Sequence, residues 1–81
     1  MIAFIVPTSK NTCLVATRNL SLYDLKTKYR MAPNIESVQF NICRRRAIQW
    51  LKENYKVRRI RKSEINKKEW NTENIEWFQI L

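Results

Sequence analysis

The pattern of apolar positions at the start of the chain predicts two strands. Residues 1–6 (MIAFIV) and 12–17 (TCLVAT) are rich in β-branched and aromatic side chains, which favour strands. Residues 7–11 (PTSKN) between them are typical of a turn. The turn lacks the Asn-Gly or Asp-Gly pair that marks the tightest hairpins. We therefore predict an N-terminal β-hairpin closed by a longer loop.

A short amphipathic helix is predicted next, over residues 21–30. Ser21 is a suitable N-cap, and Leu22, Leu25 and Tyr29 follow at spacings of three and four residues. Pro33 should end this helix, because the residue before a proline avoids helical geometry.

The segment that follows supports two interpretations. A long helix over residues 34–54, capped by Asn34, places Phe40, Cys43, Ala47 and Leu51 on one face, with Ile48, Trp50 and Tyr55 at its edges. Residues 37–42 (SVQFNI) alternate strictly, however, and would form a strand with Val38, Phe40 and Ile42 on one side. That strand would delay the helix to about Asn41 and put three arginines in its first turn, where the helix dipole opposes them. We favour the long helix.

The last third of the chain predicts extended structure. Residues 56–62 (KVRRIRK) form an extended basic segment, and Ser63-Glu64 turns the chain into a second possible strand that ends by residue 70. Residues 74–81 (NIEWFQIL) form a closing strand or a short helix capped by Thr72, with Trp77, Phe78, Ile80 and Leu81 docked on the core. The fold class is α+β, a small single domain spanning residues 1–81 with an N-terminal β-hairpin, one short and one long helix, and a C-terminal basic β-ribbon.

Composition removes several classes of function. A chain of 81 residues without glycine or histidine has no Walker loop, no dinucleotide fingerprint, no histidine-based triad and no Cys2His2 zinc site. The longest apolar run has six residues, too short for a signal peptide or a membrane span. Cys13 and Cys43 are expected to be buried free thiols in a reducing cytoplasm. No metal, disulfide or cofactor is expected.

The charge distribution is the strongest functional signal. The chain carries 16 Lys and Arg against 7 Asp and Glu, a formal charge of +9. Eleven of these bases lie between residues 44 and 68, where Glu53 and Glu64 are the only acids. Such segregation indicates a polyanionic partner. The candidate nucleic-acid-binding residues are Arg44, Arg45, Arg46, Gln49, Lys52, Arg58, Arg59, Arg61, Lys62, Lys67 and Lys68, with Tyr55 and Trp70 as candidate base-stacking residues.

These observations favour a non-enzymatic, nucleic-acid-binding regulatory protein, with DNA preferred over RNA. Two helices followed by a basic ribbon resemble the general layout of a winged helix-turn-helix, in which the second helix enters the major groove. Tyr55, Arg58 and Glu64 are the residue types of a histidine-free nuclease, but their spacing does not single them out. The alternative is a small basic modulator or inhibitor, of the kind encoded by viruses and mobile elements, that docks on an acidic protein surface.

Overall fold

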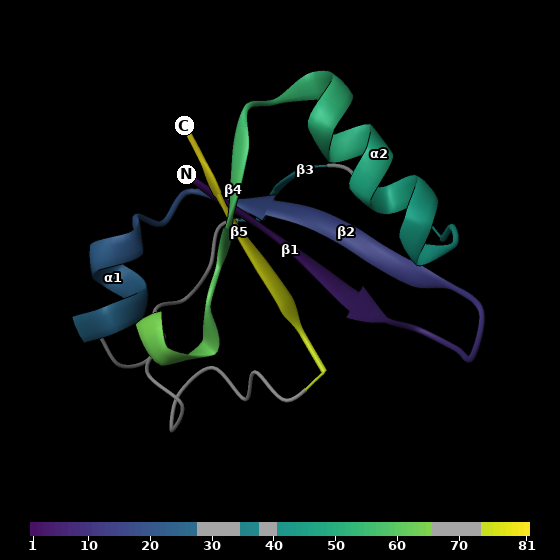
Figure 1. Cartoon of the computed structure of the whole chain (residues 1–81), viewed down its shortest axis with the longest axis horizontal. Coiled ribbons are helices and arrows are strands. Elements are labelled where there is room, and N and C mark those ends of the chain that lie inside the picture. The colour runs from purple at the N-terminus through teal and green to yellow at the C-terminus, as the bar shows by residue number, and fades with distance from the viewer. Residues whose placement is uncertain (28–34, 38–40, 66–73) are drawn as a thin grey trace.

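The computed structural model describes residues 1–27, 35–37, 41–65 and 74–81 (Figure 1). The elements are β1 (Ile2–Pro7), β2 (Cys13–Arg18), α1 (Leu22–Thr27), β3 (Ile35–Ser37), α2 (Arg44–Asn54), β4 (Val57–Ile60), the 3-10 helix η1 (Lys62–Glu64) and β5 (Glu76–Ile80). All strand pairs are antiparallel, in the order β3-β2-β1-β5-β4. The fold is therefore a small single domain of the predicted α+β class.

The predicted N-terminal hairpin is confirmed. β1 and β2 pair without a break from Ile2 opposite Arg18 to Pro7 opposite Cys13. The loop is closed by hydrogen bonds from the backbone N–H groups of Thr8 and Ser9 to the carbonyl of Thr12, at 3.0 and 3.2 Å. Short polar side chains that bond to nearby backbone stabilise such a loop in place of the tighter glycine turns.

The C-terminal segment is a strand, the first of its two predicted forms, and it lies inside the sheet. β5 pairs with β1 on one side and with β4 on the other. Trp77 and Phe78 are buried on opposite faces of the sheet, since successive side chains of a strand alternate. Leu81 was expected to dock, but it is 73% exposed, because it follows the last residue of β5.

Each face of the sheet carries its own apolar core. One core joins β1, β2, β4 and β5 to the segment around α1 and η1, through Ile2, Phe4, Ala16, Leu20, Leu25, Ile60, Ile65 and Trp77. The other lies beneath α2 and contains Ala3, Ile5, Cys13, Val15, Ala47, Leu51 and Phe78. In Figure 1, α2 lies to one side of the strands while α1 and η1 lie to the other. The central strands are therefore covered on both faces.

The favoured long helix over residues 34–54 is wrong. Residues 35–37 form β3 beside β2, and Ile42 forms an isolated bridge to Cys13, with N–H to carbonyl distances of 2.7 and 3.2 Å. β2 would otherwise leave its outer backbone groups unpaired, and pairing with this segment satisfies some of them. Helix α2 starts at Arg44, so residues 44–54 are helical in agreement with both interpretations. Val38 and Phe40 lie outside the described residues.

The basic segment is extended as predicted. Among the described residues, β4 pairs with β5. η1 confirms a turn at Ser63-Glu64, and Ile65 is buried in the core beside α1. Residues 66–70, the remainder of the predicted second strand, lie outside the described residues, as do residues 28–30 of the predicted first helix.

The two cysteines differ in environment, which corrects the expectation that both are buried. Cys13 is buried and its thiol donates to the carbonyl of Ile42 at 3.2 Å, whereas Cys43 is exposed because it immediately precedes α2. Burial raises the pKa of the Cys13 thiol. Neither is in a disulfide.

In the part of the chain that is described, no helix has both the length and the apolar character needed to cross a membrane.

Candidate nucleic-acid interface

Helix α2 positions the first group of candidate residues. Ala47 and Leu51 are fully buried against the sheet, while Arg45 and Lys52 are exposed. These two bases are seven residues apart, about two helical turns, so they lie on the same side of the helix. The segregation of apolar and basic residues on α2 is therefore as predicted.

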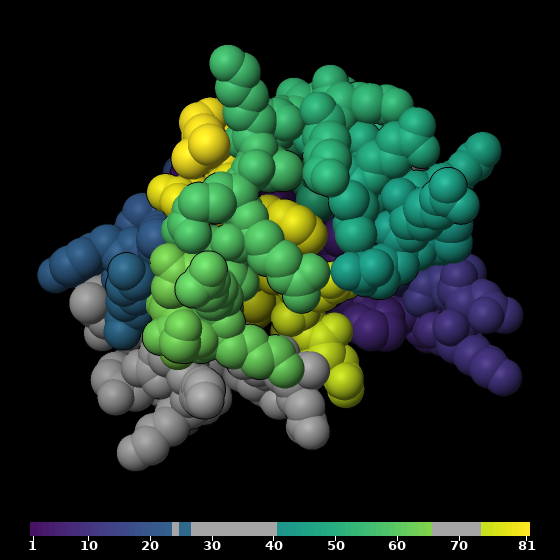
Figure 2. Space-filling model, viewed as in Figure 1, coloured from purple at the N-terminus to yellow at the C-terminus, as the bar shows by residue number. Residues whose placement is uncertain are grey.

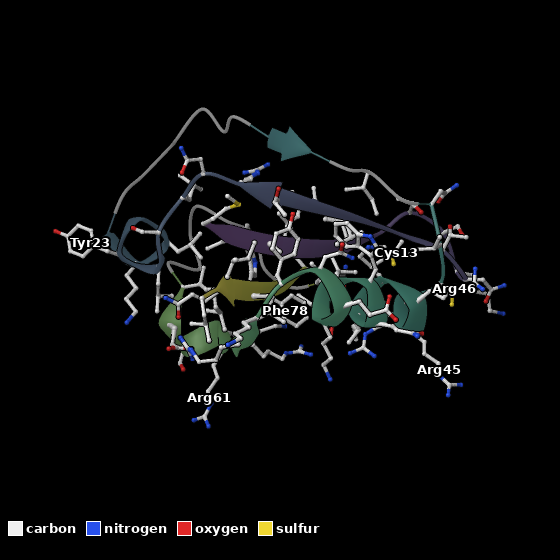
Figure 3. All side chains as sticks on the ribbon, turned by 90° about the horizontal axis from the view of Figure 1, so that it is seen from above. Cys13, Tyr23, Arg45, Arg46, Arg61 and Phe78 are labelled. Atoms are coloured by element: carbon white, nitrogen blue, oxygen red, sulfur yellow. The ribbon has the colours of Figure 1, made fainter. Side chains whose placement is uncertain are left out.

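Some of the exposed bases of α2 and of the segment around β4 face the same side of the molecule. Figure 2 looks onto this side, where α2, β4 and η1 form most of the visible surface and atoms of β5 show between α2 and β4. In Figure 3, the side chains of Arg45 and Arg61 extend in the same direction, away from the sheet. We call this surface the basic face and define it by Arg44, Arg45, Lys52, Arg59 and Arg61.

A carboxylate links the two elements of the basic face. Glu76, on β5, accepts hydrogen bonds from Nε and Nη2 of Arg44 on α2, and from Nη1 of Arg59 on β4 at 2.7 Å. The guanidinium of Arg59 also lies 6.0 Å from the centroid of the Phe78 ring. We refer to Arg44, Arg59 and Glu76 as the Glu76 cluster. It holds two arginines side by side although they are distant in sequence.

Arg58 is oriented to the opposite face of β4, where its guanidinium is fully engaged. Its three nitrogens make five hydrogen bonds, two to the carboxylate of Glu64, two to the amide oxygen of Gln79 and one to the carbonyl of Arg59. A guanidinium has five N–H donors, so none is left over. The assignment of Arg58 as a nucleic-acid contact stays a prediction, and in the structure its guanidinium bonds within the protein to Glu64 and Gln79.

The ion pairs shift the acidity of the two carboxylates. The hydrogen bonds from Arg44, supported by Arg59, hold the pKa of Glu76 below its ordinary value, although partial burial opposes the shift. The hydrogen bond from Arg58 and that from the backbone N–H of Arg61 lower the pKa of Glu64 in the same way. Both groups are therefore negatively charged at neutral pH and neutralise part of the basic surface.

Four of the candidate bases make no ion pair with the described residues: Arg45, Arg46, Lys52 and Arg61. Gln49 is exposed, but its amide donates to the carboxylate of Glu53 at 3.0 Å. Lys62 is exposed next to Arg61. Lys67, Lys68 and Trp70 lie outside the described residues.

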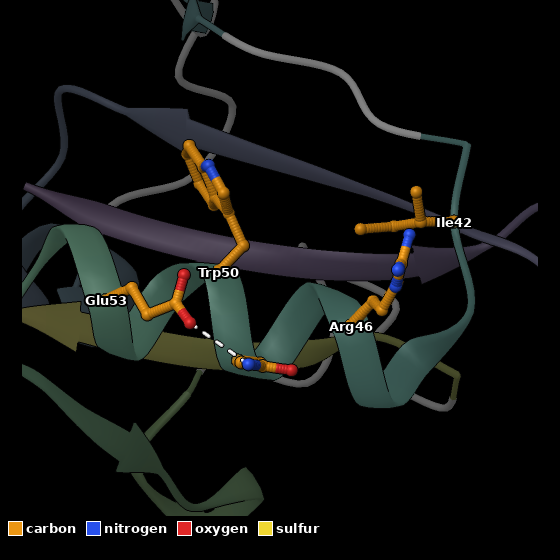
Figure 4. Close-up of a pocket in the computed structure, with 5 residues that line it drawn as sticks. Ile42, Arg46, Trp50 and Glu53 are labelled. Atoms are coloured by element: carbon orange, nitrogen blue, oxygen red, sulfur yellow. Dashed lines mark hydrogen bonds between the residues drawn. The ribbon is translucent and has the colours of Figure 1, made fainter.

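Arg46 lies on a different flank of α2. It lines a cavity of about 390 Å³ together with Ile42, Gln49, Trp50 and Glu53, and Figure 4 shows its side chain directed towards Ile42. The ring of Tyr55 meets that of Trp50 edge-on, with centroids 5.9 Å apart. Tyr55, a candidate for base stacking, is thus half-buried against another aromatic side chain.

Of the three residues considered for catalysis, Tyr55, Arg58 and Glu64, only Arg58 and Glu64 bond to each other. Arg58 and Glu64 form an ion pair, with Nη2 and Oε1 3.2 Å apart, whereas Tyr55 packs against Trp50 on the far end of α2. Among the described residues, no group of three or more Cys, Asp or Glu side chains is placed to hold a metal ion.

Sequence reasoning missed the residues that organise the basic face, Glu76 and Phe78. A signal was present, because a strand over residues 76–80 puts Glu76 on the same face as Phe78 and Ile80. A carboxylate on an otherwise apolar face of a strand needs a cationic partner. The sequence alone does not say which of the arginines supplies it.

The comparisons with known proteins add no further constraint. No family model, curated protein or solved structure matches the chain.

Proposed function

We propose that the protein is a non-enzymatic nucleic-acid-binding protein that contacts duplex DNA through its basic face. The observation that carries this proposal is that Arg45 and Arg61, bases without ion pairs among the described residues, extend to the same side of the molecule (Figure 3). Lys52 also makes no such ion pair, and helical spacing puts it on the same side of α2 as Arg45. Phosphate contacts from Lys and Arg supply most of the affinity of such proteins.

Helix α2 is the element that we expect to enter the major groove of the DNA. Arg45 and Lys52 extend from the side of α2 that is not packed on the sheet, with Gln49 between them, and Arg and Gln side chains read base edges from a helix in the major groove. Glu76 links Arg59 of β4 to Arg44 of α2, which supports the expectation that β4 follows a phosphate backbone. The winged helix-turn-helix layout places its ribbon within residues 56–70, of which β4 is one strand and residues 66–70 lie outside the described residues. The proposal therefore uses the helix and the edge of the sheet.

The salt dependence of binding to a labelled duplex oligonucleotide tests the proposal. If about five phosphates are neutralised, the logarithm of the association constant falls with the logarithm of salt concentration at a slope of about −4.5. Fluorescence anisotropy between about 50 and 200 mM salt measures this slope. Absence of binding at the lowest salt, by a sample that circular dichroism shows to be folded, would reject the proposal and favour an acidic protein partner.

A matched pair of double variants locates the surface. Arg45→Ala with Lys52→Ala removes two charges from the basic face and should reduce the salt slope by about two. Lys26→Ala with Lys56→Ala removes two exposed charges, from α1 and from the residue before β4, that are not part of the basic face, and should leave the slope nearly unchanged. Equal effects of the two double variants would show that net charge, not the basic face, determines binding.

A further inference from the structure

The arginines of the Glu76 cluster keep much of their hydrogen-bonding capacity. Arg44 uses two of its five N–H donors on Glu76, and Arg59 uses one. Their side chains are 59% and 55% exposed, while that of Glu76 is only 16% exposed. The carboxylate therefore lies beneath two guanidinium groups whose remaining donors are open to solvent.

The Glu76 cluster also carries a net positive charge. Two arginines and one carboxylate leave one positive charge in excess, whereas Arg58 and Glu64 cancel each other. Glu76 screens the mutual repulsion of the two arginines, and its two hydrogen bonds to Arg44 orient that guanidinium, while one hydrogen bond holds Arg59. Phe78 supports Arg59 from below, with the guanidinium 6.0 Å from the ring centroid. Groups held in place in this way lose little conformational entropy on binding a ligand.

We propose that Arg44 and Arg59, held by Glu76, form a binding site for one phosphodiester group of a nucleic-acid backbone. A phosphodiester carries a single negative charge, which matches the excess charge of the cluster, and its two unesterified oxygens accept hydrogen bonds from two guanidinium groups. This inference rests on the proposed function, and it assigns different roles to neighbouring arginines. Arg59 binds phosphate, and Arg58 holds Glu64 and Gln79.

Charge-conserving substitutions at the two neighbouring positions test the assignment. Arg59→Lys keeps the charge but loses the planar fork, so its affinity for a duplex oligonucleotide should fall roughly fivefold to tenfold. Arg44→Lys should behave in the same way. Arg58→Lys is the matched control and should change the affinity by less than about twofold, because its guanidinium has no donor to offer. Circular dichroism and thermal unfolding of each variant show whether the fold is retained.

The outcomes separate the failure of this site from the failure of the proposed function. If the unchanged protein does not bind DNA at low salt, the function itself is rejected. If it binds and Arg58→Lys weakens binding as much as Arg59→Lys does, the phosphodiester site is wrong. A free phosphate ion is tested as a competitor against chloride at equal ionic strength. Displacement of DNA by phosphate well beyond that by chloride, and lost in Arg59→Lys, would support the site, whereas equal displacement by the two anions in both proteins would overturn the inference.

Discussion

Arg58 and Arg59 are neighbours in the chain, yet their guanidinium groups have different environments. The alternation of a β-strand directs Arg58 towards Glu64 and Gln79 and Arg59 towards Glu76 and Phe78. In the first case every donor is used, and in the second most are free. At the residue scale, a basic side chain can therefore bind an anionic ligand only if some of its N–H donors are unused and its charge is not cancelled by neighbouring carboxylates.

The Glu76 cluster predicts a pH dependence of stability. The pKa of Glu76 is lowered in the folded protein, so its ion pairs contribute fully above its unfolded pKa of about 4.3. This contribution is lost as the pH falls below about 4.3 and through the lower folded pKa. Urea unfolding at a series of pH values should show the free energy of unfolding decreasing in this range. The decrease should be smaller in Glu76→Gln, and an identical pH profile would contradict the assigned ion pairs.

At the scale of single elements, the start of α2 is the least conventional feature. The first turn has three arginines and no acid, and Cys43 at the N-cap makes no hydrogen bond to the helix through its side chain. The dipole opposes the arginines by roughly 0.3–1 kcal/mol each at most. Burial of Ala47 and Leu51 outweighs this cost, since an amphipathic helix is stabilised mainly by packing.

The N-cap of α2, where Cys43 makes no side-chain hydrogen bond to the helix, gives a prediction about helix stability. Cys43 has extended backbone angles, φ −69° and ψ 154°, which suit an N-cap residue. Cys43→Ser adds a hydroxyl that accepts from the free N–H groups of the first turn and should be more stable than Cys43→Ala by about 0.5–2 kcal/mol. Chemical denaturation of the two variants measures the difference. Equal stabilities would mean that the helix does not begin at this residue.

At the scale of the whole molecule, the first and the last of the described strands pair in the middle of the sheet. β5, the last strand, lies between β1, the first, and the basic strand β4. It carries Trp77 and Phe78 into the two separate cores. The position of the basic face therefore depends on β5, because β4 has no other partner among the described strands.

Removal of β5 should therefore abolish folding. A variant that ends at residue 75 loses the strand between β1 and β4 and should show no cooperative unfolding transition. Leu81→Ala is the control, because this side chain is 73% exposed and its replacement should change the stability by less than about 0.5 kcal/mol. Thermal unfolding followed by circular dichroism compares the two. A cooperative transition in the shortened chain would show that β4 is held by other contacts.

Local patterns were sufficient for the hairpin, for the apolar face of α2 and for the extended basic segment. In each of these, neighbouring residues carry the period that the element needs, so the information lies within a few positions of the chain. The same holds for the exposed bases of α2, since helical spacing alone separates Arg45 and Lys52 from Ala47 and Leu51. The choice between helix and strand over residues 34–42 failed because the deciding contacts were with β2. The backbone N–H and C=O groups on the outer edge of β2 need partners, and an extended segment supplies them. The strand propensity of a segment does not reveal such a distant requirement.

What the sequence alone determined is therefore the periodicity of each element and the concentration of positive charge after residue 43. Tertiary structure decided which of those charges remain available. Glu76 is 32 residues from Arg44 and 17 from Arg59, and only the insertion of β5 beside β4 and beneath α2 brings the three together. The physical reason is that hydrogen bonds and ion pairs act over a few ångströms in space, whatever the separation along the chain. Strand alternation and helical periodicity, by contrast, are properties of the local backbone.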